Sequence, residues 1–322
     1  MIPSVLLDTY RRFGADLPFG DPRRPHGVAM EGWFWRLTAV ESGDVVVVLA
    51  AVNRDGAGKR WGTAGVAAHP GGFSEAVAVP EAWADAEGLV RVGDACVASP
   101  NSVSVRLPNV SLDVELERPG RWPRRAFGGL GAAHTIPGLS QYWHPWLLRA
   151  TVRGRAVLGG REVDLDGAVA YAEKNWSNGG FPERWWWGQA HGFAGDPDAW
   201  VAFAGGLAGP GRLRFTATSL VVSAGGEMVR LVRPLQPLRV EVGTSGWRFS
   251  GRSASGVSVT VEGHANGTPP HLLPVPVPSE RRHAEAAAAQ HLAGELRLEV
   301  RRRGRRVFAG TSALAGLEQG RT

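Results

Sequence analysis

The stretch SVSVRLPNVSLDVELE, residues 102–117, alternates apolar and polar side chains on both sides of a short turn. Because successive side chains of a strand point to opposite faces, this alternation predicts two half-buried strands. Similar segments recur along the chain, at residues 33–40, 44–52, 147–159, 211–223, 238–243, 256–264 and 294–311. Turn-forming Gly, Pro, Asn and Asp separate them about every dozen residues, which is typical of β-sandwiches and β-barrels. The chain is therefore predicted to be all-β.

Two segments are predicted to be helical. SERRHAEAAAAQHL, residues 279–292, offers Ser279 as N-cap and is followed by Gly294 as a stop, and a short helix is expected in VLLDTYRRF near the start. A strand-rich chain of 322 residues rarely makes one closed sheet, so we expect two antiparallel barrel-like or sandwich-like halves. The turn-rich stretch GDPDAW, residues 195–200, is the predicted junction, which gives halves of 1–195 and 196–322.

The formal net charge is +6, and nearly all the basic residues are scattered Arg, as a GC-rich genome's codon usage would produce. The run RRRGRR, residues 301–306, is an exception that we interpret as a solvated strand end. An anionic membrane surface suits this run better than nucleic acid does. We therefore expect no nucleic-acid partner, and at most peripheral contact with a membrane.

Other classes of site are disfavoured. Cys96 is the only cysteine, so no disulfide framework exists and a reducing compartment is expected. The start lacks the apolar run of a signal peptide, and VVVVLAAV (45–52) is too short to span a bilayer, so a cytoplasmic protein is expected. The nine His show no metal-ligand spacing, and neither GxSxG nor a phosphate-binding loop occurs, so we expect no metal and no cofactor.

Large aromatic and polar side chains crowd together in AEKNWSNGGFPERWWWGQAHGF, residues 172–193. Strand alternation gives two polar-aromatic faces: Tyr171, Glu173 and Asn175 in the first segment, and Trp185, Trp187, Gln189, His191 and Phe193 in the second. The connection SNGGFPE is long enough for the two segments to pair, which would face Glu173 toward the tryptophans.

A carboxyl group against Trp surfaces would be poorly solvated, which favours its protonated form. Glu173 could then deliver a proton to an alkene, and the ring faces could stabilise the resulting carbocation. The alternative is that Glu173 pairs with Lys174 or an Arg, while the tryptophans fill a barrel interior. Related acid-and-aromatic groups occur at Glu31, Trp33 and Trp35, and at His144 between Trp143 and Trp146, where core packing is again the alternative.

Five blocks resemble the tocopherol cyclase family and follow one another in that family's order. They are EGWFWRL (31–37), YAEKNWSNGGFPERWWWGQAHGF (171–193), GTPPHLLPVP (267–276), GELRLEV (294–300) and VFAGTSALAGLEQG (307–320). A looser resemblance extends to carotenoid hydratases of the hydroxyneurosporene synthase type, which show an acid-x-Asn-Trp pattern before a similar Trp-x-Trp strand. That wider group implies paired lipocalin-like β-barrels, in agreement with the strand pattern.

The resemblance implies ring closure on a prenylated quinol without a redox cofactor: the prenyl double bond is protonated, and the phenolic oxygen captures the tertiary cation. It implies Glu173 as the acid. Further motif positions match at Lys174, Asn175, Trp176, Trp185, Trp187, Gln189 and Phe193. The sequence departs from the plant enzymes at His191, where they have an amide, and at Ser177 and Asn178, which replace glycines.

We predict Glu173 as the proton donor, with Glu31 in reserve. The tryptophans expected to stabilise the cation are Trp33, Trp176, Trp185 and Trp187. The groups expected to orient or deprotonate the nucleophilic hydroxyl are His191, Gln189 and Asn175, and the other pocket candidates are Trp35, Tyr171, Lys174, Phe193 and His144. An alkene hydratase and a non-enzymatic carrier of a hydrophobic isoprenoid are the alternatives.

Overall fold

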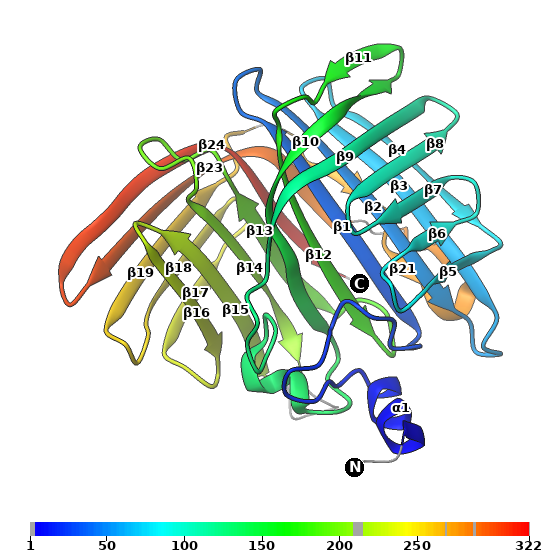
Figure 1. The fold of residues 1–322 in the computed structure, drawn as a ribbon, viewed down its shortest axis with the longest axis horizontal. Coiled ribbons are helices and arrows are strands. Elements are labelled where there is room, and N and C mark those ends of the chain that lie inside the picture. Colours follow the sequence, from blue (N-terminus) through cyan, green and yellow to red (C-terminus); the bar gives the residue numbers. More distant parts are fainter. Residues whose placement is uncertain (1–3, 209–214, 268, 286–287, 322) are drawn as a thin grey trace. The chain divides into compact units, whose positions relative to one another are not determined.

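The computed structural model describes residues 4–208, 215–267, 269–285 and 288–321. The chain divides into two compact units, Met1–Phe181 with Leu273–Ala287, and Pro182–Leu272 with Ala288–Thr322. Each unit contains one large antiparallel, barrel-like sheet (Figure 1), so the predicted all-β architecture with two lipocalin-like halves is confirmed. The predicted junction at 195–200 lies inside the second unit.

The strands of the first unit are β1 (Met30–Ala39), β2 (Asp44–Arg54), β3 (Arg60–His69), β4 (Phe73–Val79), β5 (Ala82–Ala84), β6 (Val90–Val92), β7 (Cys96–Ser99), β8 (Ser102–Leu107), β9 (Val110–Arg121), β10 (Tyr142–Leu158), β11 (Arg161–Asp164) and β12 (Val169–Ser177). In the described residues they form one sheet in the order β4-β3-β2-β1-β12-β10-β9-β8-β7-β6-β5, with β11 beside β10. The sheet curls until β5 and β6 contact β2 and β3. At that contact a Cβ on Gly62 would lie only 2.7 Å from that of Ala82, which explains the glycine.

Alternate side chains of these strands fill the interior of the first sheet. On β1, Trp33, Trp35 and Leu37 join this core, and on β2, Val46 and Val48 do so. The alternation in 102–117 corresponds to β8 and β9, as predicted. A short helix, α1 (Ser4–Arg12), precedes the sheet and confirms the helix expected near the start. Among the described residues, no helix combines the length and apolarity needed to cross a membrane.

The strands of the second unit are β13 (Arg184–Ala190), β14 (Trp200–Ala208), β15 (Phe215–Ala224), β16 (Glu227–Arg233), β17 (Leu238–Val242), β18 (Gly246–Arg252), β19 (Val257–His264), β20 (His271–Leu273), β23 (Ala288–Arg302) and β24 (Arg305–Arg321). Their order is β16-β15-β14-β13-β24-β23-β19-β18-β17, with β20 beside β23. A separate core that includes Trp186, Phe203, Phe249 and Leu317 fills this sheet.

The first unit contains one segment from late in the chain, here called the strap, residues 273–287. It holds the short strands β21 (Pro276–Val277) and β22 (Arg282–His283) around the 3₁₀ turn η2 (Pro278–Glu280). Trp61 Nε1 on β3 donates a 3.0 Å hydrogen bond to the carbonyl of Pro278, and Thr63 Oγ1 lies 3.0 Å from Nε2 of His283. These two contacts fasten the strap to β3 of the first sheet.

The predicted helix at 279–292 is wrong. Helical geometry is limited to η2, and β23 begins at Ala288; residues 286 and 287 lie outside the described residues. From Ala288 onward alternate side chains are buried, and the strand pairs with β24. Alanine favours helices only weakly, by a few tenths of a kcal/mol over most residues, so a long partner strand overrides it.

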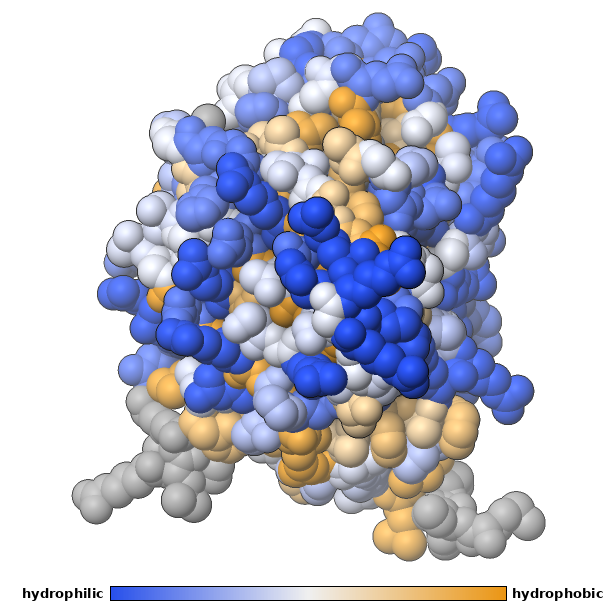
Figure 2. All heavy atoms as spheres, turned by 90° about the vertical axis from the view of Figure 1, so that its left-hand side faces the viewer, coloured by the Kyte–Doolittle hydropathy of each residue, from blue (hydrophilic) through white to orange (hydrophobic). Residues whose placement is uncertain are grey.

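The basic run 301–306 forms the turn between β23 and β24, at the left in Figure 1. Its side chains are exposed, and Arg301 and Arg302 pair with Glu299 and Glu227. Figure 2 views this side, where hydrophilic side chains cover most of the surface. The interpretation of the run as a solvated strand end is confirmed.

Candidate functional site

The two segments that carry most candidate residues belong to different sheets. β12 lies between β1 and β10 in the first unit, whereas β13 lies between β14 and β24 in the second. The predicted pairing of 171–177 with 185–193 is therefore wrong. Local alternation fixes which side chains share a face but not which strand lies alongside, and one true neighbour of each strand, β1 for β12 and β24 for β13, is distant in the chain.

In the first unit, the register separates the predicted acid from the predicted cage. Trp33 lies opposite Lys174, and Phe34 lies opposite Glu173. Because paired residues in an antiparallel sheet share a face, Trp33 and Trp35 lie on the side of Lys174, and Glu173 lies on the other side. Trp33, predicted to stabilise the cation, therefore lies on the opposite face of the sheet from Glu173, the predicted proton donor.

Glu173 is nonetheless well buried, with 4% of its surface exposed. It accepts a 2.7 Å hydrogen bond from the hydroxyl of Tyr171, on the same face of β12. Burial, together with the Glu173 charge, raises the pKa of Tyr171 well above 10, so Tyr171 keeps its proton and acts as a donor. Asn175, on the same face, accepts a 3.4 Å hydrogen bond from Gln141.

Lys174 and Glu31 form a buried ion pair on the opposite face. Lys174 Nζ lies 2.7 Å from Oε2 of Glu31, and it also donates to the carbonyl of Arg24 at 2.8 Å and to Nδ1 of His26 at 3.0 Å. Its charge lies 5.1 Å from the ring centre of Trp33. The three protons of the ammonium group are therefore all engaged.

Glu31 cannot serve as the reserve proton donor. Burial alone would raise the pKa of Glu31, but the nearby Lys174 and His26 outweigh it and hold the pKa well below its usual range. Its carboxylate also accepts the backbone N–H groups of His26 and Gly27, each at 2.8 Å. Burial lowers the pKa of Lys174 to about 8 despite its partner. Glu31 is thus a structural anion.

Trp176 and His144 are also part of the interior. The Trp176 ring stacks on His26 with a centroid distance of 4.4 Å and on Tyr142 with 5.4 Å, and its Nε1 donates to the carbonyl of Gly14. Nδ1 of His144 accepts the backbone N–H of Gly129 at 3.2 Å. Burial lowers the pKa of His144 well below 6.5, so its ring is neutral. Both side chains fasten surrounding loops to the first sheet.

The second unit contains a carboxyl group that sequence reasoning missed. Glu318 on β24 lies opposite Trp187 on β13 and Gln290 on β23, so the three share a face. Trp185 Nε1 and Gln290 Nε2 each donate to Glu318, to Oε1 and Oε2 respectively, at 2.7 Å. This face lies away from the core that contains Trp186 and Leu317. A buried acid against tryptophans therefore exists, but Glu318 supplies it.

No cationic side chain in the described part of the chain pairs with Glu318. Burial raises the pKa of Glu318, while its hydrogen bonds with Trp185 and Gln290 act in the opposite direction. The pKa of Glu318 is thus shifted in the direction expected for a carboxyl group against Trp surfaces. Glu318 lies in the family-like block VFAGTSALAGLEQG, which was the available signal.

Two amides beside Glu318 present buried oxygen atoms. Oε1 of Gln290 and Oε1 of Gln189 have no hydrogen-bond partner. The amide nitrogen of Gln189 lies 3.0 Å from Nδ1 of His191, and with Nδ1 as the acceptor the amide oxygen is directed away from the imidazole. Each oxygen can accept a hydrogen bond from a hydroxyl group. Gln189, on the same side of β13 as Trp185 and Trp187, agrees with the predicted face.

Phe193 does not belong to this face. β13 ends at Ala190, so strand alternation does not reach position 193. Phe193 packs in the second core, edge-on to Phe308 with a centroid distance of 5.9 Å. The prediction that Phe193 shares a face with Trp185 is wrong. Within the described ranges, no cluster of three His, Cys, Asp or Glu side chains could hold a metal ion.

Gly320 positions Trp185 against Glu318. The two residues are cross-strand neighbours, and a Cβ on Gly320 would overlap the Trp185 ring. Gly320→Ala should displace the indole from Glu318 and cost about 1–3 kcal/mol of unfolding free energy. Urea unfolding followed by tryptophan fluorescence measures this loss. Gly246→Ala, whose new Cβ would have 4.0 Å to its nearest neighbour, is the matched control, and equal losses would contradict the account.

An all-β chain with two lipocalin-like halves and buried acids beside tryptophans defines a two-barrel lipocalin-like protein. The sequence model of the family described as tocopherol cyclase-like matches residues 137–321, which is more than half of the chain. The chain belongs to this family.

Solved structures with the same fold have low sequence identity. Kievitone hydratase from Nectria haematococca is 10% identical, with a TM-score of 0.52, over 92% of this chain and 90% of that chain. CghA is 13% identical, with a TM-score of 0.60, over 92% and 88%. A putative AttH from Nitrosomonas europaea is 13% identical, with a TM-score of 0.50, over 92% and 93%. At these identities the likeness demonstrates a shared fold.

Proposed function

We propose that this protein is a cofactor-independent isomerase that protonates a prenyl double bond and closes a ring with a phenolic hydroxyl. The observation that carries the proposal is the Glu318 carboxyl, buried beside Trp185 and held by two N–H donors. Membership of the tocopherol cyclase-like family supports the reaction class. We assign Glu318 as the proton donor in place of Glu173.

The hydrogen bonds of Glu318 leave room for a transferable proton. Each carboxyl oxygen offers two lone-pair positions, and Trp185 and Gln290 take one on each oxygen. A remaining position can hold the proton, which passes to the alkene carbon and leaves a tertiary cation. The Trp187 ring, on the same face, would stabilise that cation.

The nucleophile would be oriented by the amide oxygens. The phenolic O–H of the substrate would donate to Oε1 of Gln290 or Gln189, which raises the electron density on its oxygen. As the C–O bond forms, the phenolic proton leaves and reprotonates the Glu318 carboxylate. Substrate and product then have the same atoms, and the reaction is an isomerisation.

Glu173 remains the rival donor. It is as buried as Glu318, but it already accepts a hydrogen bond from a tyrosine hydroxyl that keeps its proton. A hydrogen bond donated to a carboxylate stabilises the charged form, which has no proton to transfer to an alkene. We therefore propose that Glu173 is not the proton donor.

A hydratase is the second candidate, because an amide oxygen that can hold a phenol can also hold a water molecule. The two reactions differ in the mass of the product. Purified protein should be incubated anaerobically with 2,3-dimethyl-5-phytyl-1,4-hydroquinol and analysed by chromatography with mass spectrometry. We expect a product of unchanged mass and shifted retention time. A gain of one water would establish the hydratase, and tight binding without conversion would establish a carrier of this compound.

A further inference from the structure

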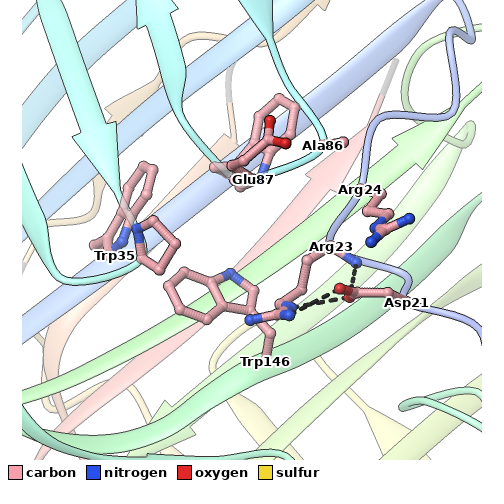
Figure 3. A pocket seen from close by; sticks show the side chains of 10 residues that line it. Asp21, Arg23, Arg24, Trp35, Ala86, Glu87 and Trp146 are labelled. Carbon is pink, nitrogen blue, oxygen red and sulfur yellow. Dashed lines mark hydrogen bonds and ion pairs between the residues drawn. The ribbon is translucent and has the colours of Figure 1, made fainter.

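The pocket inside the first sheet has room for little more than one water molecule. Trp33, Trp35 and Trp146 line it (Figure 3), and its volume is about 20 Å³. Arg23, also in its wall, is paired with Asp21 at 2.7 Å (Figure 3). A larger apolar partner of the first unit finds no room in this pocket, which leaves the outer surface of the unit.

Exposed apolar side chains gather on two segments of the first unit, residues 4–20 and 122–141. Five of the eleven large hydrophobic side chains that are exposed in the described residues belong to these segments. Between 46% and 72% of the surface of each is exposed, and they are Val5, Leu6, Phe13, Phe19 and Ile136, here called the apolar end. Single exposed apolar side chains are ordinary, but a group of them marks an interaction surface.

Hydrogen bonds hold the two segments of the apolar end together. The hydroxyl oxygen of Tyr142 lies 3.0 Å from the carbonyl oxygen of Phe13 and 2.6 Å from that of Ile136. The backbone N–H of Phe19 donates to the carbonyl of Ala126 at 2.7 Å. Figure 1 shows α1 below the strands of the first unit. The exposed side chains are therefore carried on a fixed framework at one end of this unit.

Phe19 has a backbone conformation that phenylalanine rarely adopts. Its φ is 61°, in the left-handed region, which is sterically unfavourable for a bulky side chain. Burial does not offset this strain in the free protein, because 65% of the side chain is exposed. Asparagine or glycine would suit the backbone better. A phenylalanine at this position is therefore consistent with a surface that becomes buried against a partner.

Arginine side chains accompany the apolar end. Arg12, Arg124 and Arg125 are exposed, and none of them is paired with an acid in the described part of the chain. The two segments contain four Arg and two Asp, which gives a net charge of +2. An apolar surface with unpaired arginines is complementary to an anionic lipid surface. A second copy of the same surface would bring like charges together, which disfavours self-association.

From these features we propose that the apolar end docks the protein on an anionic membrane. Its apolar side chains would enter the boundary between headgroups and acyl chains, and the three arginines would meet the lipid headgroups. The proposal places the membrane contact here and not at the basic run 301–306, where Arg301 and Arg302 are already paired with glutamates. It goes beyond the proposed isomerase reaction and does not depend on it.

The test is flotation of the whole chain with vesicles, in the absence of substrate. The vesicles consist of phosphatidylcholine alone, or of equal amounts of phosphatidylcholine and phosphatidylglycerol. We expect tighter binding to the anionic vesicles, which weakens as salt increases. Replacing both Arg124 and Arg125 by glutamine should lower the affinity for anionic vesicles roughly thirty-fold. Phe19→Asn should lower it roughly ten-fold, and because asparagine tolerates the left-handed conformation, the chain should remain folded.

Two variants serve as matched controls. Leu235→Asn changes a side chain that is 55% exposed in the second unit, and Arg305→Gln with Arg306→Gln changes two exposed residues of the basic run. Both should bind vesicles as the wild type does. Equal losses in these controls, or no binding by the wild type, would overturn the proposal.

Size-exclusion chromatography without lipid tests the remaining occupant of the apolar end. Self-association that Phe19→Asn abolishes would identify a second copy of the chain as the partner, and the membrane proposal would be wrong. A monomeric wild type that binds anionic vesicles would support it. Turnover of the prenylated quinol dispersed in detergent tests the isomerase separately.

Discussion

Replacing Glu318 by glutamine is expected to lower turnover of the prenylated quinol by at least ~100-fold, since a general acid typically contributes 10²–10⁴. Glutamine has the same size, and its oxygen can still accept the N–H of Trp185. It has no transferable proton, however. Initial rates measured by chromatography, with substrate well above KM, test the loss directly.

The stability of Glu318→Gln separates chemistry from folding. Because the pKa of Glu318 is raised by burial, the folded protein retains a proton at pH values where the unfolded chain has released it. The wild type therefore loses stability as pH rises through that range, and the glutamine variant does not. We expect the variant to be at least as stable as the wild type at pH 7, with the difference vanishing in acid. Normal turnover by Glu318→Gln would show that Glu318 is not the proton donor. A complete loss of turnover in Glu173→Gln, with normal turnover in Glu318→Gln, would identify Glu173 as the donor.

Replacing Lys174 by methionine is expected to cost about 3–5 kcal/mol of unfolding free energy, which is the usual effect of breaking a buried ion pair. The change leaves the Glu31 carboxylate, 2% exposed, without its cation. It also removes the hydrogen bonds from Nζ to Arg24 and His26. Urea unfolding at pH 7 measures the loss.

The second lysine provides the control for this prediction. Lys59 is exposed, and Lys59→Met should change the unfolding free energy by less than about 0.5 kcal/mol. Adding Glu31→Met to Lys174→Met removes the stranded anion and should restore part of the stability, since buried pairs can often be exchanged for apolar groups. If Lys174→Met were as mild as Lys59→Met, the ion pair would contribute little to the first unit.

Features that depend on neighbouring residues could be predicted from the sequence. Period-two alternation correctly gave the strands in 102–117 and the grouping of Trp185, Trp187 and Gln189 on one face of β13. The same reasoning failed at 279–292, where a run of alanines has no inherent strand pattern and only the pairing with β24 decides. The pairing of β12 and β13 failed for the same reason, because register and partner are set by contacts between distant segments.

In the candidate site, too, features set by neighbouring residues could be predicted, and features set by contacts between distant segments could not. A buried acid does lie beside a tryptophan in the second unit, but it is Glu318 of β24, near the end of the chain, and not the predicted Glu173. Neither stated alternative for Glu173 anticipated that Lys174 pairs with Glu31 through the 24–31 segment. Gln290 was missed because it lay inside the predicted helix. Identifying partners across a sheet requires the register, which the sequence pattern alone does not contain.

The strap makes the first barrel depend on a part of the chain that is synthesised late. When residue 181 leaves the ribosome, every strand of that sheet is present, yet the indole of Trp61 and the hydroxyl of Thr63 have no strap to bind. They acquire it only after residues 182–272 of the second unit have been translated. Completion of the first barrel is therefore expected to wait for synthesis of most of the second unit, and a chain stopped at Phe181 should be an incomplete protein rather than a separable half.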